Sequence, residues 1–148
     1  MIQSPIFNQI IYQLETTDFP NPAAGANWVE TIVDTNLRHI CTMNWAFIAG
    51  VGVANRFMQL LIQNGAGGFK YLFQSPTAIV AADICQFSAF PAAPYVTHIA
   101  GSGVGLFPLP VNLFIEPTDS IHIIVMGILA ADQLFGPTIQ FKIWRTEP

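Results

Sequence analysis

The stretch Phe57–Gln74, which reads FMQLLIQNGAGGFKYLFQ, decides the fold class. Its first half alternates Gln59 and Gln63 with apolar residues, as expected for a β-strand that has one better-buried face. The turn Asn64-Gly65-Ala66-Gly67-Gly68 follows, and its glycines accept the positive φ angles that tight connections need. A second apolar run, Phe69–Gln74, comes after the turn. The stretch therefore predicts two strands joined by a short turn.

The same period of two continues in the C-terminal half of the chain. Ile139–Trp144 alternates in the same way, and the β-branched run Ile121–Met126 predicts a central strand that is covered on both sides. The alanine-rich runs 78–84 and 127–134 leave a helical turn open as an alternative. Further strand candidates are Ile6–Leu14, Trp28–Asp34, Leu37–Ala49, Ala78–Phe87, Tyr95–Ala100 and Asn112–Ile115. We expect an all-β chain of about eight to ten strands, arranged as an antiparallel sandwich or barrel.

Two regions do not fit the pattern of core strands. Residues 1–27 are predicted to form an extended N-terminal arm that pairs with a neighbouring sheet, ahead of a single domain at 28–148. Phe90–Pro94 and Gly101–Pro110 are predicted to be long uncharged loops, which either contact a partner or fold back over the core of the domain. The candidate contact residues are Ile6, Phe7, Ile10, Tyr12, Phe90, Tyr95, Leu106, Phe107 and Leu109.

The composition indicates that much of the protein surface is neutral or apolar and that another molecule covers it. Only 14 of the 148 residues are charged, whereas roughly 37 would be usual, and 52% are hydrophobic. This composition excludes disorder, and a net charge of −4 argues against nucleic acid as a partner. The longest charge-free stretch, Ile84–Ile115, contains four prolines and does not fit a membrane helix. No basic residue precedes an apolar core at the N-terminus, so we expect no secretory signal. Because the surface has few charges and no membrane helix is expected, we expect another protein to cover that surface.

The reactive side chains follow none of the common catalytic patterns. His39, His98 and His122 lack the close spacing of metal ligands, and no nucleophile elbow is present. Cys41 lies two residues from His39, which predicts one shared strand face, and that pair is more typical of a core than of a thiolate site. We expect both Cys41 and Cys85 to be reduced in a cytoplasmic environment. We therefore assign no catalytic residue, cofactor or metal, and expect no enzyme.

Asp83 is the acidic residue that stands inside an apolar segment, and Arg56 is the candidate partner for its charge. Such a pair would be structural, because a buried carboxylate requires a counter-charge or hydrogen bonds.

The run Val53-Ala54-Asn55-Arg56 before the strand Phe57–Gln63 and the turn Asn64-Gly65 resembles a corner in small virion proteins of tailed bacteriophages. In those proteins a strand that starts Leu-Arg, here Leu37-Arg38, leads into the corner. A Leu-Pro segment and a turn precede a later long strand, and the chain closes with another strand. The corresponding segments here are Leu109-Pro110, Glu116–Ser120 and Ile139–Arg145. The resemblance covers roughly residues 28–145, and this chain departs from it at Pro117-Thr118, where a turn glycine is expected, and in its low charge.

The resemblance implies a jelly-roll or related β-sandwich that forms part of a virion assembled in the host cytoplasm. It favours a head decoration protein, often a trimer, that binds its own copies and the major capsid protein, with a tail, neck or fibre subunit as the alternative. Asn55 would tolerate the turn conformation and Arg56 would bond loop carbonyls. Two other classes remain: a carbohydrate-binding module and a small cupin-like enzyme. The stacking faces of such a module would be Trp28, Trp45, Trp144 and Tyr95.

Overall fold

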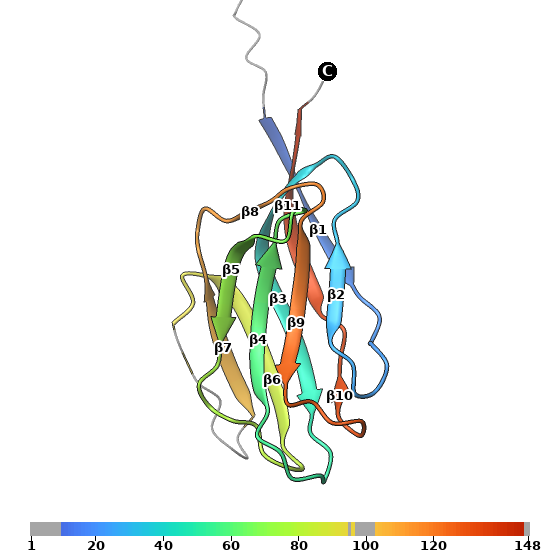
Figure 1. The fold of residues 1–148 in the computed structure, drawn as a ribbon. Helices are drawn as coiled ribbons and strands as arrows, with labels where there is room; N and C mark the ends of the chain where they lie inside the picture. Colours follow the sequence, from blue (N-terminus) through green and yellow to red (C-terminus); the bar gives the residue numbers. More distant parts are fainter. Residues whose placement is uncertain (1–9, 95, 97–102, 147–148) are drawn as a thin grey trace, which may run out of the picture.

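Two β-sheets packed face to face make up the fold (Figure 1). The structure is a computed structural model that describes residues 10–94, 96 and 103–146. The described strands are β1 (Ile10–Asp18), β2 (Trp28–Thr31), β3 (Leu37–Ile48), β4 (Phe57–Gln63), β5 (Phe69–Gln74), β6 (Ile84–Pro91), β7 (Val104–Leu109), β8 (Phe114–Ile115), β9 (Ser120–Met126), β10 (Gln133–Leu134) and β11 (Thr138–Thr146).

Sheet A has the strand order β1-β11-β3-β6-β7, with the short strands β8 and β10 also paired to β3. Sheet B has the order β2-β9-β4-β5. The predicted all-β class is confirmed, and the two facing sheets agree with a sandwich. The described residues form no helix, so 78–84 and 127–134 contain turns and short strand segments instead. Within this part of the chain, no helical segment could cross a membrane.

The core lies between the sheets and follows from the alternation in the sequence. Met58, Leu60 and Ile62 of β4 point inward beside Ile121 and Ile123 of β9, and all five are fully buried. Each such side chain stabilises the fold by about 1.5–3 kcal/mol. An aromatic group fills the space between the sheets, with Phe107 5.4 Å from Trp45, 5.6 Å from Phe87 and 4.7 Å from Phe73 between ring centroids.

The prediction of a loop at Gly101–Pro110 was wrong, because Val104–Leu109 is β7. This strand runs parallel to β6, so the sandwich is not antiparallel throughout. Both faces of β7 are largely apolar, which hides the period of two in the sequence. Pro108 is tolerated because β7 is the last strand of its sheet, where a missing N–H interrupts no central ladder.

The N-terminal arm also differs from the prediction. β1 extends to Asp18 and pairs along its whole length with β11 of the same chain, so residues 15–18 belong to a strand and not to a linker. Residues 19–27 then lie against the chain's own C-terminal region. The Phe19 amide donates to the Pro137 carbonyl at 2.9 Å, and the Asn21 side chain accepts the Gly136 amide at 2.9 Å. The described part of the arm is thus tied to its own sheet by backbone hydrogen bonds.

A β-bulge in β3 interrupts the regular alternation that was expected to place His39 and Cys41 on one face of the strand. Ile40 pairs with Phe141 and Thr42 with Gln140, so Cys41 is the extra residue of the bulge. Buried positions switch from even numbers before the bulge to odd numbers after it, because the inserted residue shifts the alternation. Cys41 and Cys85 are both free thiols, Cys41 half-buried and Cys85 buried. Burial raises the pKa of the Cys85 thiol to about 11.

Candidate interaction surface

Three loops meet at the end of the sandwich opposite the start of β1 and the end of β11 (Figure 1). They are residues 49–56 between β3 and β4, 75–83 between β5 and β6, and 127–132 between β9 and β10. Backbone hydrogen bonds join the first two loops, from the Ala82 amide to the Gly50 carbonyl at 3.0 Å and from the Ala49 amide to the Asp83 carbonyl at 2.8 Å. The loops therefore form one connected end.

A buried ion pair joins the first loop to the third. Arg56 Nε donates to Asp132 Oδ2 at 2.6 Å, and both side chains are completely shielded from solvent. Asp132 also accepts the backbone amides of Gly50 at 2.8 Å and Leu129 at 2.7 Å. Burial raises the pKa of Asp132, but the hydrogen bonds from Arg56, Leu129 and Gly50 outweigh burial and hold this pKa below its usual range. The carboxylate therefore stays ionised and fixes both loops.

Arg56 also holds its own loop. Its two terminal guanidinium nitrogens donate to the carbonyls of Gly52 at 2.9 Å and Ala54 at 3.2 Å. The suggested partner Asp83 was wrong, since the ion pair joins Arg56 to Asp132. Asp83 instead accepts the Val80 amide within its own loop, at 3.3 Å. Asn55 is exposed and has no positive φ angle, so the expected reason for an asparagine there is not met.

Most of the side chains that these loops present to solvent are apolar, and Asn55 is the exposed polar exception named above. Val51 and Val53 are 85% and 95% exposed, on either side of Gly52. The three charged residues of the loops, Arg56, Asp83 and Asp132, are all buried. We call the large exposed apolar side chains of these loops, together with the first residue of β6, the tip; they are Val51, Val53, Val80, Leu129 and Ile84. An exposed apolar group of this kind on a rigid frame is typical of a protein contact.

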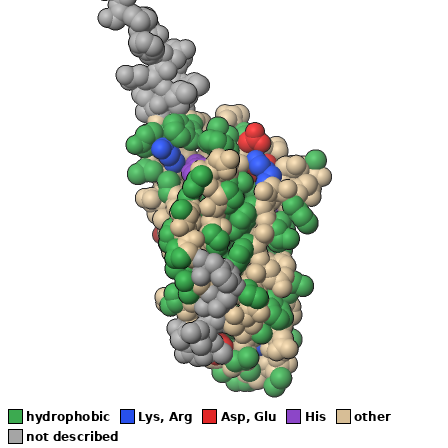
Figure 2. All heavy atoms as spheres, turned by 90° about the vertical axis from the view of Figure 1, so that its left-hand side faces the viewer, with side chains coloured by type: hydrophobic (Ala, Val, Ile, Leu, Met, Phe, Trp, Pro, Cys, Tyr) green, Lys and Arg blue, Asp and Glu red, His purple; other side chains and the backbone are tan. Residues whose placement is uncertain are grey.

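Charged side chains gather at the other end of the molecule. Lys70 reaches Asp119 at 2.7 Å and Glu116 at 3.1 Å, and Arg38 forms an ion pair with Asp34. On the side shown in Figure 2, basic side chains lie near the upper end, while apolar and uncharged side chains cover most of the rest. Charge is therefore scarce at the tip, and the ion pairs of Lys70 and Arg38 lie at the opposite end.

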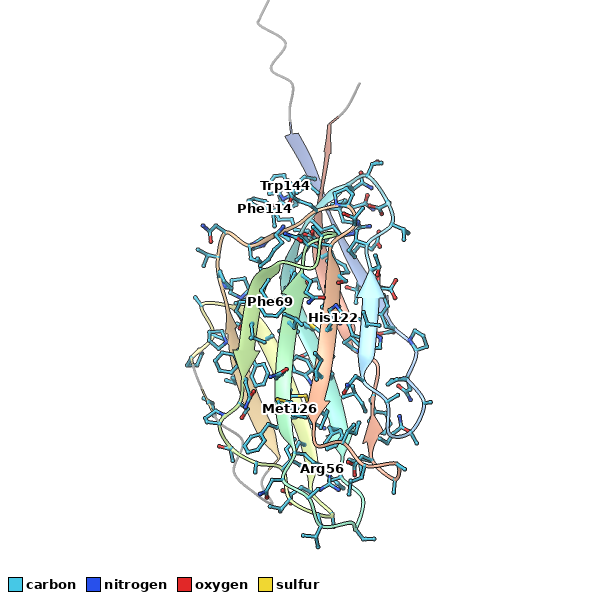
Figure 3. All side chains as sticks on the ribbon, viewed as in Figure 1. Arg56, Phe69, Phe114, His122, Met126 and Trp144 are labelled. Carbon is cyan, nitrogen blue, oxygen red and sulfur yellow. The ribbon has the colours of Figure 1, made fainter. Side chains whose placement is uncertain are left out.

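Among the described outward positions that pair across sheet B, none has an ionised side chain, and we call these positions the sheet B face. Lys70 of β5 is the extra residue of a bulge and forms ion pairs with Asp119 and Glu116. His122 lies in the middle of the sheet B face, between Val29 of β2 and Leu61 of β4, and pairs with Ser120 Oγ at 2.8 Å (Figure 3). Burial lowers the pKa of His122, so the ring is neutral at pH 7. The other members are Thr31, Phe57, Gln59, Gln63, Phe69, Leu72, Gln74, Ile124 and Met126.

The predicted contact residues do not form a single surface. Phe107 and Leu109 are buried in the core, because β7 directs them inward between the sheets, so this part of the prediction was wrong. Phe90 and Leu106 are half-buried on the outward face of sheet A. Tyr12 is exposed there beside Trp144, with ring centroids 5.6 Å apart. Ile6, Phe7, Tyr95 and the side chain of Ile10 lie outside the described residues.

The aromatic residues suggested for sugar stacking do not form a single surface either. Trp28 and Trp45 are buried in the core, whereas Trp144 is half-buried and carries Lys142 Nζ 4.7 Å from its ring centroid. His39 and His122 lie on different sheets, and His98 is outside the described residues. No group of three metal-ligating side chains comes together in the described part of the chain.

Sequence reasoning missed the tip and Asp132. The tip combines loops that lie far apart in the sequence, and Asp132 stands in the largely apolar run 127–134, which was left open as a helical turn. The available signal was Ala49–Ala54, a loop segment without any polar side chain that only Asn55 separates from Arg56. Comparison with protein families, with curated proteins and with solved structures finds no match to this chain.

Proposed function

We propose that this chain is a structural virion component, a decoration protein that binds the major capsid protein of the head through its tip. It acts by binding, in many copies, on a virion assembled in the host cytoplasm. A tail, neck or fibre subunit is the alternative within the same class. The observation that carries the proposal is the apolar tip, held rigid by the buried Arg56–Asp132 pair.

The pairing of the strands supports a jelly-roll type of sandwich. Apart from β7, β8 and β10, the strands pair in nested order: β1 with β11, β2 with β9, β3 with β6 and β4 with β5. All four pairs are antiparallel, as in a long hairpin that has been rolled into two sheets. Viral capsid proteins are among the proteins built on jelly rolls, so this support is an analogy at the level of the fold.

The tip suits a repeated contact with a neutral, apolar patch of the capsid protein. Burial of a valine contributes about 1.5–3 kcal/mol before the costs of association. The frame keeps those costs low, because Val51 and Val53 sit on a loop that Arg56 already fixes through two carbonyls. Contacts of this size are weak one at a time, and repetition over a shell turns them into firm attachment.

The test uses particles that carry this chain. Electron cryo-microscopy locates the chain, and its copy number separates a decoration protein, present across the whole head, from a tail part present in few copies. The double variant Val51→Asp/Val53→Asp should fold and yet be lost from the particles, with occupancy reduced at least tenfold, because the contact would bury two unpaired carboxylates. The matched control is Val33→Asp, since Val33 is 91% exposed in the loop between β2 and β3. It should reach full occupancy.

Two results would contradict the proposal. One is full occupancy of the particles by the double variant, which would leave the tip without a role in attachment. The other is that no particle contains the chain.

A further inference from the structure

The sheet B face combines exposed apolar side chains with polar groups that are already paired. Val29, Phe69, Leu72 and Met126 are its exposed apolar members, and Phe69, His122 and Met126 are labelled in Figure 3. Leu61 lies near the centre of the face and is covered by its neighbours. A large apolar surface on a β-sandwich usually has a partner.

Four of the polar side chains of this face pair with one another. Gln59 Nε2 donates to Gln74 Oε1 at 2.7 Å and also contacts Met126 Sδ at 3.1 Å. Ser120 Oγ and His122 Nε2 form the second pair, at 2.8 Å. Dehydrating a polar group is unfavourable mainly when the group loses its partner. A second surface can therefore cover this face while the Gln59–Gln74 and Ser120–His122 hydrogen bonds stay in place.

Charge restricts what that second surface is. Each chain carries a net charge of −4, so two copies repel one another unless the surfaces that meet are neutral. The sheet B face meets this condition, whereas the outward face of sheet A carries Lys142 and Asp18. Two copies can pack through an uncharged face without repulsion, because the contact brings no like charges together.

We propose that the sheet B face packs against the same face of a second copy of this chain in a two-fold contact. This inference rests on the proposed assembly of copies on a virion, and it concerns a different surface from the tip. The four strands β2, β9, β4 and β5 have four, seven, seven and six residues, and a strand spacing of about 4.8 Å with a rise of about 3.3 Å per residue gives a flat area of roughly 380 Å². Two such faces with their side-chain relief bury about 1,000 Å², the lower bound for a specific interface.

The size of the contact sets the expected affinity, a dissociation constant in the micromolar range. The full chain should sediment at twice its 16.2 kDa mass at about 100 μM and dissociate on dilution. The double variant Leu72→Glu/Met126→Glu should raise the dissociation constant at least a hundredfold, because two carboxylates would be buried against their own copies.

A matched control places the same charges on the other face. Leu14→Glu/Val104→Glu changes two residues that are each 54% exposed on the outward face of sheet A, compared with 49% for Leu72 and 46% for Met126. This control and the tip variant Val51→Asp/Val53→Asp should both remain dimeric. Circular dichroism and thermal unfolding verify that every variant is folded.

The outcomes separate this inference from the proposed function. A wild-type chain that stays monomeric up to about 1 mM, a trimer, or a dimer that Leu72→Glu/Met126→Glu leaves intact would overturn the two-fold contact and leave attachment through the tip untouched. A dimer that this variant alone dissociates supports the contact, even if particles never carry the chain.

Discussion

At the scale of single residues, Asp132 matters most for the tip, because its carboxylate holds Arg56 and two backbone amides. We expect Asp132→Asn to lower the free energy of unfolding by about 3–5 kcal/mol, since it leaves the buried Arg56 charge uncompensated. Urea denaturation measures the loss. The double variant Arg56→Met/Asp132→Leu removes both charges and should recover most of the stability. A double variant no more stable than Asp132→Asn would contradict this account.

The same carboxylate should make the fold sensitive to acid. The pKa of Asp132 in the folded chain lies below its ordinary value of 3.8, and the hydrogen bond from Arg38 lowers that of Asp34 to about 2. A carboxyl with a depressed pKa stabilises the fold above its unfolded pKa and loses that effect as the pH falls. We expect the free energy of unfolding to fall between about pH 4 and pH 2. The fall should be clearly shallower in Asp132→Asn and little changed in Asp34→Asn, since Asp34 is half-exposed.

Thr118 occupies the turn where the resemblance led us to expect a glycine, and its φ angle is +74°. A β-branched residue is strained in this left-handed region by about 1–2 kcal/mol, which glycine avoids. Thr118→Gly should therefore raise the free energy of unfolding by about 1 kcal/mol in urea denaturation, after allowance for the greater entropy of glycine in the unfolded chain. Thr35→Gly, in a turn without a positive φ angle, is the control and should be neutral or destabilising.

The sequence predicted Arg56 as a structural residue but not its partner. A long cationic side chain directly before an apolar strand suggests a local bonding role, and the carbonyls of Gly52 and Ala54 lie within four residues of it. The ion pair with Asp132 spans 76 positions and depends on where two loops meet in space. Asp83 and Asp132 are equivalent in the sequence, because both are single acidic residues in apolar surroundings, and only the packing distinguishes them.

At the scale of elements, the prediction succeeded where one face of a strand is polar. β4 and β5 have the predicted bounds, because glutamines or a turn mark their alternation and their ends. It failed for β7, which is apolar on both faces, and it ended the strand Ile6–Leu14 four residues before the end of β1, because the polar residues 15–18 resemble a linker. The pairing of β1 with β11 is a contact between the two ends of the chain, and no local pattern encodes it.

β1 is the strand at one edge of sheet A, so deleting it tests how much this strand contributes to the stability of the fold. Deleting residues 1–9 leaves every β1–β11 pair in place, whereas deleting residues 1–18 exposes the edge of β11. We expect the longer deletion to lower the unfolding midpoint by about 10 °C or more and to promote aggregation through the open edge. Differential scanning calorimetry and light scattering measure both effects, with the deletion of residues 1–9 as the control. Equal stability of the two truncated chains would mean that β1 contributes little to the fold.

At the scale of the whole molecule, the low charge led us to expect an interface, but it gave no position for one. The charge-free stretch Ile84–Ile115 largely builds β6 and β7, and Phe87 and Phe107 from it are part of the core. Part of the exposed apolar surface comes from the same stretch, at Ile84, Val104, Val111 and Phe114, and other parts come from the rest of the tip and from the sheet B face. Composition contains no information on which residues are neighbours in space. It therefore predicts how much of the surface is neutral and apolar, but not where that surface lies.

The affinity of a neutral interface should depend little on NaCl, and this salt dependence is a test of the molecule as a whole. Raising NaCl from about 0.1 M to 1 M shortens the screening length from about 10 Å to 3 Å, and contacts between exposed charges weaken accordingly. Association through the tip or the sheet B face should change less than threefold, because neither surface has an ionised side chain among its described residues. Ammonium sulfate should strengthen it and cooling should weaken it, as for apolar burial. Sedimentation and particle occupancy in each salt measure the response, and a tenfold loss in 1 M NaCl would show that charged groups carry the contact.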